Sequence, residues 1–236
     1  MNKLIPALTL AALMLSGCGS HTTPATAPET TAAPTAAVTE AMAETASPYP
    51  DHTLWDVSSM SYCGYHVSSE YWMGDQDHFT LFTCRDSSGS TLWTQEAPHH
   101  NGGAQVSPTW PLGIADEKFF YYHNGVVTAL DLTTGETLWQ SPDTGICLAG
   151  PESAWVDDDF VCLGEFFGSN LAVLNTKGQL IREVPTLDPN LYYITRITRN
   201  GSSLTVHLDS CDFTKIPDGG PLPDGTDLTV PIDWIS

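Results

Sequence analysis

Basic residues are scarce in this sequence, and their scarcity excludes two large classes of partner. The 236 residues include 8 Lys and Arg against 28 Asp and Glu, which gives a formal net charge of −20. Nucleic-acid-binding proteins neutralise phosphates with clustered Lys and Arg. Proteins that adhere to anionic lipid headgroups use basic patches in the same way. Eight basic side chains are too few to build a basic patch of either kind. We therefore expect no nucleic-acid partner.

The motifs of several enzyme classes are missing. The sequence has no Gly-x-Ser-x-Gly elbow, P-loop, dinucleotide-binding glycine fingerprint or Cys-x-x-Cys pair. The pair His99-His100 lies between Pro98 and Asn101, which indicates a solvated loop rather than a metal site. The run Asp157–Asp159 lacks the spacing of a calcium loop and indicates a charged turn. We therefore predict no enzyme activity, no metal site and no cofactor.

Long apolar runs are absent except near the N-terminus, where the sequence resembles a secretory signal. Lys3 supplies a positive charge, and the apolar stretch from Ile5 to Leu15 is short for a transmembrane helix. It ends in Leu-Ser-Gly-Cys18, which matches the bacterial lipobox, whose cysteine is lipidated and becomes the new N-terminus. The alternative is an ordinary secretory peptide with a chance cysteine. We predict a lipoprotein signal peptide at residues 1–17 and a lipid anchor, such as palmitate, on Cys18.

Large apolar side chains are almost absent from the next thirty residues. This stretch consists mainly of Ala, Thr, Pro and Glu and cannot bury a core. We predict that residues 18–49 are the lipidated cysteine and a disordered linker, and that residues 50–236 form one folded domain. The linker would hold this domain on the extracytoplasmic side of a bacterial cell membrane, with the lipid as its membrane contact.

Cysteines are few, and their number after the anchor is odd. Five remain: Cys63, Cys84, Cys147, Cys162 and Cys211. Export permits disulfides, but at least one of five must be unpaired or intermolecular. Spacing alone does not fix the connectivity, and Cys147–Cys162 is the first candidate pair.

Helical periodicity is also absent from the predicted domain. Its apolar runs are four to seven residues long and are separated by Gly, Asp, Asn or Ser, as in Gly125–Leu130 and Leu171–Leu174. The 19 Gly and 17 Pro also disfavour an all-helical bundle. This pattern predicts an all-β fold, either a sandwich, a barrel or a propeller.

An internal repeat favours the propeller. The tripeptide Thr-Leu-Trp ends at Trp55, Trp93 and Trp139, with spacings of 38 and 46 residues. A turn that ends in glycine precedes the second and third copies, and a degenerate fourth copy follows Gly178. A strand–turn–strand period of this length is typical of propeller blades. We expect each Trp to pack between neighbouring blades and each turn glycine, including Gly135, to have a positive φ.

The segment from Val127 to Trp139 resembles the pyrroloquinoline-quinone-type (PQQ-like) propeller repeat. It has an apolar strand, Asp131, a Thr-Gly pair ending at Gly135, and the Trp. The resemblance implies an antiparallel β-propeller, and residues 50–236 have room for about four blades at ~45 residues each. A β-sandwich with hairpins is the alternative. Quinone-dependent dehydrogenases of this family have about eight blades and adjacent cysteines beside the cofactor; no two cysteines are adjacent here.

These features predict a non-catalytic protein-binding or scaffolding module at the cell envelope. The chain resembles a propeller lipoprotein of the outer-membrane barrel-assembly machinery in its expected cellular location and its repeat type. That lipoprotein has about twice as many blades. The alternative is a lipoprotein that binds or senses a small solute, such as a sugar or metal ion. The aromatic residues Trp72, Trp110 and Trp155 are candidates for a binding face, although blade packing is the commoner role of such residues.

A propeller also needs a way to close, because sheets with free edges are prone to unwanted pairing. The first Thr-Leu-Trp is typical of an outer blade strand, yet only linker precedes it. We therefore expect residues 52–57 to complete the last blade beside Leu204–Leu208. In the alternative, the segment from Asp227 to Trp234 takes that place, and a second copy closes the ring.

Overall fold

The computed structural model describes residues 49–75, 77–97, 100–101, 109–185, 187, 192–210 and 225–234. These residues form four antiparallel β-sheets, and no α-helix occurs among them. The prediction of an all-β antiparallel fold with about four blades is confirmed. The predicted signal peptide, Cys18 and nearly all of the predicted linker lie outside the described residues, as do His99 and Cys211.

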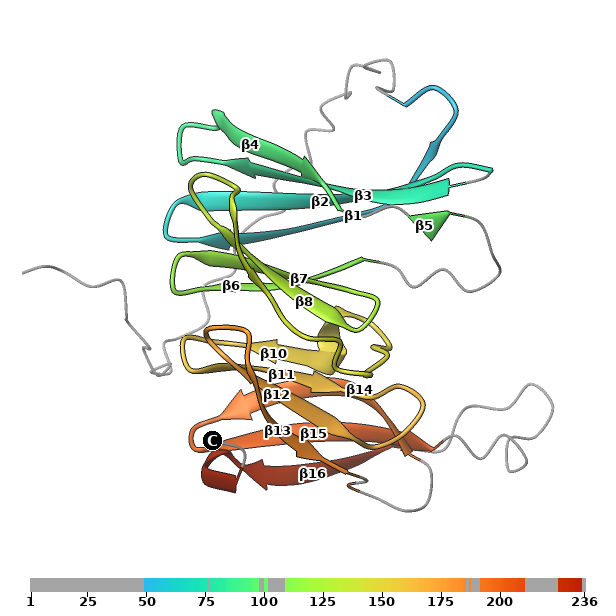
Figure 1. The fold of residues 1–236 in the computed structure, drawn as a ribbon, viewed down its shortest axis with the longest axis vertical. Coiled ribbons are helices and arrows are strands. Elements are labelled where there is room, and N and C mark those ends of the chain that lie inside the picture. The colour runs from blue at the N-terminus through green and yellow to red at the C-terminus, as the bar shows by residue number, and fades with distance from the viewer. Residues whose placement is uncertain are drawn as a thin grey trace, which may run out of the picture. The chain divides into compact units, whose positions relative to one another are not determined.

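Each sheet is built from one continuous stretch of chain, and its strands lie in chain order (Figure 1). The first sheet contains β1 (Thr53–Tyr62), β2 (Tyr65–Met73), β3 (Asp77–Arg85) and β4 (Thr91–Glu96), with β5 (His100–Asn101) paired to β3. The second contains β6 (Trp110–Ala115), β7 (Lys118–His123), β8 (Val126–Asp131) and β9 (Thr137–Gln140). After the 3₁₀ turn η1 (Pro151–Ser153), the third contains β10 (Ala154–Val156), β11 (Phe160–Gly164), β12 (Leu171–Asn175) and β13 (Leu180–Val184). The fourth contains β14 (Tyr192–Asn200), β15 (Ser203–Ser210) and β16 (Thr226–Pro231), followed by η3 (Ile232–Trp234).

Three apolar layers hold neighbouring sheets together. Successive side chains of a strand point to opposite faces, so one strand can serve two layers. In β11, Val161 and Leu163 pack toward the second sheet, whereas Phe160 and Cys162 pack toward the fourth. Between the first two sheets, the ring centroids of Phe82 and Phe119 are 4.9 Å apart. Burying each such side chain stabilises the fold by about 1.5–3 kcal/mol.

The repeat tryptophans connect each sheet to a turn of the next sheet. Trp93 at the end of the first sheet is buried, and its Nε1–H donates to the carbonyl of Leu132 at 2.9 Å. Trp139 in β9 donates in the same way to the carbonyl of Thr176 at 3.0 Å. A Cβ added to Gly135 or Gly178 would lie less than 3 Å from these two indoles. Each turn therefore needs glycine both for its backbone and for the ring packed against it.

Side chains inside these turns hold the backbone. The Asp131 carboxylate accepts from the N–H groups of Thr133 at 2.9 Å and Thr134 at 2.8 Å. Asn175 accepts from the N–H of Lys177 at 3.0 Å. The hydroxyl of Thr133, followed by these backbone groups, lowers the pKa of Asp131 from its ordinary value. The glycines that follow, Gly135 and Gly178, have φ of 75° and 77°, a left-handed backbone that other residues adopt only with strain.

Trp55 does not share the position of the other two tryptophans. It lies in β1, the first strand of its sheet, whereas Trp93 and Trp139 lie in the last strands of theirs. Its side chain is 70% exposed. The expectation that the first Thr-Leu-Trp is an outer blade strand is therefore wrong. A two-residue turn at Cys63 and Gly64 joins β1 directly to β2, so the local hairpin takes this segment.

The expected N-terminal closure is also wrong. The strand β16 pairs with β15 from Ser203–Pro231 to Leu208–Thr226, so residues 226–231 occupy the edge beside Leu204–Leu208. Contacts between sheets follow chain order: β1 with β6, β6 with β10, and β10 with β14. Figure 1 shows the first and fourth sheets at opposite ends of the stack. Pairing of the last strand thus follows the alternative prediction, whose second copy stays a prediction.

The candidate disulfide is not formed. Cys147 and Cys162 are both free thiols, and they lie in different surroundings. Cys162 is fully buried between the third and fourth sheets, and burial raises its pKa to about 12. The backbone N–H of Cys147 instead donates to Glu165 at 3.3 Å. Strand alternation accounts for the separation, because it turns Cys162 into the layer on the far side of β11.

Candidate functional site

A groove lies among the first strands of the first two sheets and the turn that precedes the third. Its volume is about 500 Å³. Twelve residues from four separate stretches of the chain line it: Trp55, Asp56, Ser58, Ser69, Tyr71, Thr109, Trp110, Pro111, Ala149, Gly150, Pro151 and Glu152. The first strands β1 and β6 come close here, and η1 contacts β6. The groove therefore lies on the inner side of the array, where consecutive blades meet.

Local irregularities of the strands shape this groove. The pairing of β1 with β2 shifts between Leu54 and Asp56, so Trp55 is an extra residue at a β-bulge. Bulges bend a strand and redirect a side chain, and the Trp55 side chain is 70% exposed. A second shift in β6, between Pro111 and Gly113, follows Trp110. Both large rings are thus placed where regular strand packing is interrupted.

The groove combines aromatic rings, hydroxyls and carboxylates. Trp55, Trp110 and Tyr71 supply the rings, and Asp56 and Glu152 supply two negative charges. None of its described lining residues is a Lys, Arg, His or Cys, so no neighbouring cation neutralises these carboxylates within the groove. Aromatic faces attract cations, and the two exposed carboxylates add charge attraction to that preference. This arrangement suits binding of a ligand with positive and apolar parts.

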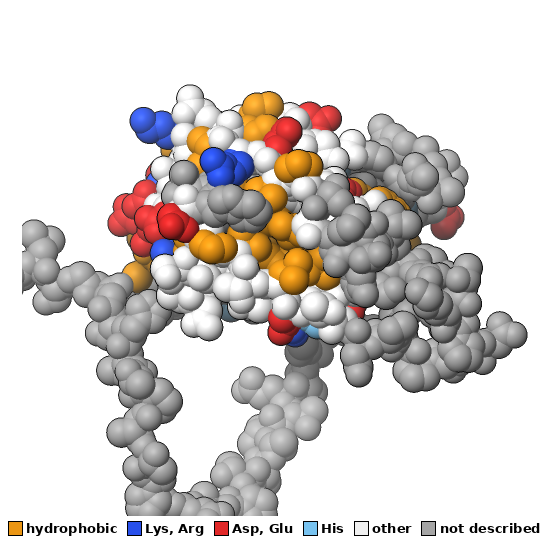
Figure 2. Space-filling view, turned by 90° about the horizontal axis from the view of Figure 1, so that it is seen from below, with side chains coloured by type: hydrophobic (Ala, Val, Ile, Leu, Met, Phe, Trp, Pro, Cys, Tyr) orange, Lys and Arg blue, Asp and Glu red, His pale blue; other side chains and the backbone are white. Residues whose placement is uncertain are grey.

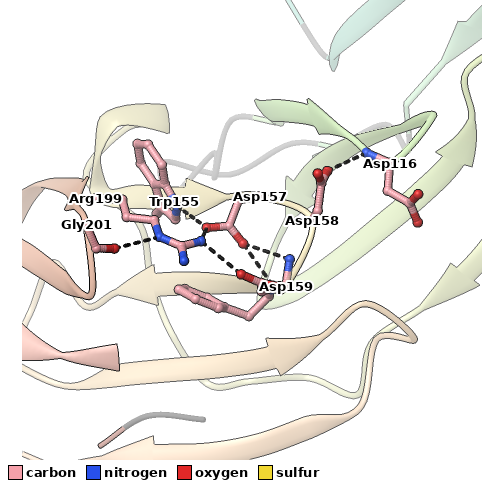
Figure 3. A network of polar contacts seen from close by, with 8 residues as sticks. Asp116, Trp155, Asp157, Asp158, Asp159, Arg199 and Gly201 are labelled. Atoms are coloured by element: carbon pink, nitrogen blue, oxygen red, sulfur yellow. Dashed lines mark hydrogen bonds and ion pairs between the residues drawn. The ribbon is translucent and has the colours of Figure 1, made fainter. Parts of the chain in front are cut away.

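The three consecutive aspartates form a charged turn at the β10–β11 junction (Figure 3). Arg199 forms ion pairs with Asp157 and with Asp159, the second at 3.0 Å. Asp158 accepts a hydrogen bond from the backbone N–H of Asp116 at 2.9 Å. Among the described residues no group of three His, Cys, Asp or Glu side chains is arranged to hold a metal ion. The turn instead joins three sheets, because Asp116 belongs to the second and Arg199 to the fourth.

The Asp157 carboxylate is the best-satisfied member of this network. Burial acts to raise its pKa, but hydrogen bonds from Trp155 Nε1 at 2.8 Å, from the N–H of Asp159 at 2.9 Å and from Arg199 outweigh burial. The net effect lowers the pKa of Asp157 from its ordinary value. This carboxylate is therefore held charged by the fold, which indicates a structural role.

The other residues considered from the sequence lie in different places. Trp110 lines the groove, whereas Trp155 is bound to Asp157. Trp72 is buried, and its ring centroid lies 5.3 Å from that of Tyr49. His100 belongs to the short strand β5 rather than to a loop. In the part of the chain that the structure describes, no helix is long and apolar enough to span a bilayer.

No pattern in the sequence predicts the groove directly. Asp56, Tyr71 and Glu152 are not part of the repeat, and nearly a hundred positions separate the first from the last. The one usable signal was Trp55, because its tripeptide recurs without the turn that precedes the later copies. A repeat member in the wrong context is a candidate for another role.

Comparisons with known proteins agree with the repeat. A family profile described as "Outer membrane protein assembly factor BamB" matches residues 50–212, which is more than half of the chain. The search of curated proteins found no match. Among solved structures, the chain is similar to the computationally designed Ika8 protein, at 14% identity and a TM-score of 0.41, over 75% of this chain and 58% of that one. It is also similar to a protein of unknown function from Bacteroides caccae, at 12% identity and a TM-score of 0.38, over 71% and 65%. The chain spans less than two thirds of either structure.

Proposed function

The chain belongs to the PQQ-repeat family described as outer membrane protein assembly factor BamB, and we propose that it is a lipid-anchored envelope protein. In this proposal its propeller binds another protein and catalyses no reaction. The lipid is carried by Cys18, and the linker sets the reach of the domain. Fully extended, about 30 linker residues would span ~100 Å. The domain can thus meet partners well away from the membrane surface.

The observation that carries this proposal is the groove. Exposed rings beside uncompensated carboxylates are a binding surface rather than a reaction centre, because the groove's described lining offers neither a nucleophile with its base nor a metal-binding set. Tryptophan and tyrosine are also enriched where proteins bind one another. The family's name refers to an assembly factor, which is consistent with a protein partner for this chain as well.

A small solute is the second candidate ligand, and the residues that line the groove favour a sugar over a metal ion. Aromatic rings with carboxylates and hydroxyls such as Ser58, Ser69 and Thr109 also suit a sugar. The two candidates differ in size. A sugar would fill the groove alone, whereas a protein would also cover the strand beside it.

Photo-crosslinking in the native host tests the proposal. A photoreactive amino acid replaces Trp55 in the full chain, and the control places it at Ile181, which is exposed on the third sheet. We expect a crosslinked protein adduct from position 55 but not from position 181. Equal adducts at the two positions would contradict the protein-binding role. So would the absence of an adduct at position 55 together with binding of labelled sugars to the purified domain.

The anchor is tested by Cys18→Ala, which we expect to release the protein from membranes or to leave its signal peptide uncleaved.

A mature-sized Cys18→Ala variant that still fractionates with membranes as a lipid-labelled protein would contradict the anchor. This measurement is independent of crosslinking, so the anchor and the binding role are tested separately.

A further inference from the structure

The strand β1 differs from the first strands of the next two sheets in its length and exposure. It has ten residues, against six in β6 and three in β10, and eight of its ten positions are exposed. The strand pairs with β2 on one edge, and no described residue pairs with its other edge. Among the described residues no sheet precedes the first one, so no described sheet packs against its side away from the second sheet.

The hairpin turn fixes which backbone groups face the unpaired edge. Cys63 and Gly64 both have positive φ, 45° and 87°, as in a two-residue hairpin turn. Tyr62 and Tyr65 close this turn. Counting back from Tyr62 in steps of two gives Met60 and Ser58, whose backbone groups face β2. The intervening residues Val57, Ser59 and Ser61 therefore have N–H and C=O groups that point away from β2. We call this row of groups the free edge of β1.

The free edge borders the groove, and carboxylates lie on both faces of the strand. On one face, Asp56 and Ser58 line the groove together with Glu152. On the other face, Val57 is 55% exposed and pairs across the ladder with Glu70. A chain added to this edge would therefore place alternate side chains beside Asp56 and Glu152, and the intervening ones beside Val57 and Glu70.

We propose that the free edge of β1 binds an extended segment of a partner protein by strand addition, and that the segment carries basic side chains alternating with apolar or small ones. Strand addition takes its affinity from main-chain hydrogen bonds and its specificity from alternate side chains. The carboxylates and the net charge of −20 select a basic segment. The same charge opposes a second copy of this chain, which would bring like charges together. This inference rests on the proposed protein-binding function and names the chemistry of its partner.

A single substitution separates the backbone from the side chain. In Ser59→Pro the free edge loses one N–H, while the ladder to β2 loses none, because proline is tolerated on an edge when its nitrogen faces outward. Ser59→Ala removes only the hydroxyl. The probe is a fluorescent peptide in which Arg alternates with Thr or Leu, and its binding to the full chain is followed by anisotropy. We expect at least tenfold weaker binding to Ser59→Pro and unchanged binding to Ser59→Ala.

Modified peptides test the same contact without altering the protein. Two versions of the probe carry N-methyl groups on complementary sets of alternate residues, so each blocks one edge of the peptide. We expect one version to lose binding and the other to retain it, because a peptide strand pairs through one edge. Binding of both versions at the strength of the parent peptide would overturn the proposal, whatever the folding of Ser59→Pro.

Charge selection is tested by matched neutralisations. Asp56→Asn should weaken binding of the basic probe severalfold, and added salt should narrow the difference. The control Glu183→Gln removes the same charge from an exposed position on β13, far along the chain, and should leave binding unchanged. Equal effects of both substitutions would overturn the local role of Asp56.

Two further results would reassign the edge. A tight dimer in sedimentation that Ser59→Pro dissociates would give the edge to a second copy and overturn the proposal. A Trp55 crosslink to a protein that is unchanged in Ser59→Pro would overturn strand addition while leaving the proposed binding function intact. Absence of any protein crosslink would instead contradict the proposed function itself.

Discussion

At the scale of single residues, the same tripeptide has two fates. Trp93 is 8% exposed and bound to the next sheet's turn, whereas Trp55 is 70% exposed at the groove. The difference arises from strand position, because a last strand faces the neighbouring blade's turn, whereas Trp55 lies at a bulge in the first strand β1, beside the groove. Sequence identity over three residues therefore does not imply equal energetic roles.

This contrast gives a stability prediction with an internal control. Trp93→Ala should lower the free energy of unfolding by about 3–5 kcal/mol, as for other buried aromatics. Trp139→Ala should cost less, because Trp139 is only half-buried. Trp55→Ala should leave stability within about 0.5 kcal/mol of the parent. Urea unfolding of the three variants checks the order, and equal losses for Trp55 and Trp93 would contradict it.

The thiol of Cys162 gives a second prediction at this scale. Burial raises its pKa to about 12, so the thiol stays protonated at pH 8, and reagents that attack the thiolate also cannot reach it. We expect iodoacetamide to leave Cys162 unmodified in the folded protein and to alkylate it in urea, as followed by mass spectrometry. A non-reduced digest should contain no Cys147–Cys162 linked peptide. Recovery of that peptide would refute the separation of the two thiols.

At the scale of elements, turns do more than reverse the chain. The β10–β11 turn contacts the β6–β7 turn through Asp158 and the fourth sheet through Arg199. The Asp157 side chain is 17% exposed and the Arg199 side chain 31%, whereas the Asp159 side chain is 66% exposed. Hydrogen bonds to a shielded charged group such as Asp157 contribute about 1.5–3 kcal/mol each, more than exposed pairs such as Arg199–Asp159 do.

This network predicts a change in acid stability. The folded state lowers the pKa of Asp157 below its ordinary value of 3.8, so the stabilisation is complete above that value and is lost as the pH falls through the lowered pKa. Arg199→Gln should cost about 1–3 kcal/mol at pH 7. The variant should then lose less stability than the parent between pH 5 and about pH 2, since its Asp157 pKa lies nearer the ordinary value.

Urea titrations across this pH range provide the measurement. The control Lys177→Gln removes the same positive charge from an exposed turn and should leave both the stability at pH 7 and its pH dependence unchanged. Parallel pH curves for Arg199→Gln and the parent would rule out the assigned role of Asp157.

Prediction from sequence succeeded for elements fixed by local chemistry. The strand punctuation and the blade-length period were enough to predict four antiparallel sheets, because hairpins form between neighbours in sequence. Prediction failed where the partner of a strand was in question. The segment after Thr226 carries no repeat tryptophan, so the sequence offered it beside Leu204–Leu208 only as the alternative to residues 52–57. The groove was invisible for the same reason, since Trp55, Trp110 and Glu152 meet only through tertiary packing.

At the scale of the whole molecule, charge is the dominant long-range term. Figure 2 views the end of the array formed by the fourth sheet and shows acidic side chains gathered on its left, with hydrophobic side chains exposed in the middle. With 28 acidic and 8 basic residues, the folded chain repels itself more than the expanded unfolded chain does. At neutral pH and low salt, this repulsion therefore lowers the stability of the folded state.

Salt should accordingly stabilise the protein. Raising NaCl from about 0.01 M to 0.15 M shortens the Debye length from about 30 Å to 8 Å. We expect the melting temperature to rise by a few degrees, since about 1 kcal/mol corresponds to roughly 2–4 °C for a chain of this size. Potassium chloride at equal ionic strength should give the same shift. A melting temperature that falls with salt would show that attractive ion pairs dominate instead.

The chain-order stacking of the four sheets also bears on how the protein forms. A ring whose first and last blades share a sheet cannot complete its first blade until the final residues are available. Here each sheet draws its strands from one continuous stretch, so most pairings are close in sequence and rapid to find. When the polypeptide emerges N-terminus first from the export channel, the first sheet can form before the residues of the fourth sheet have emerged. Folding can thus proceed one blade at a time, and the last sheet packs onto sheets that have already formed.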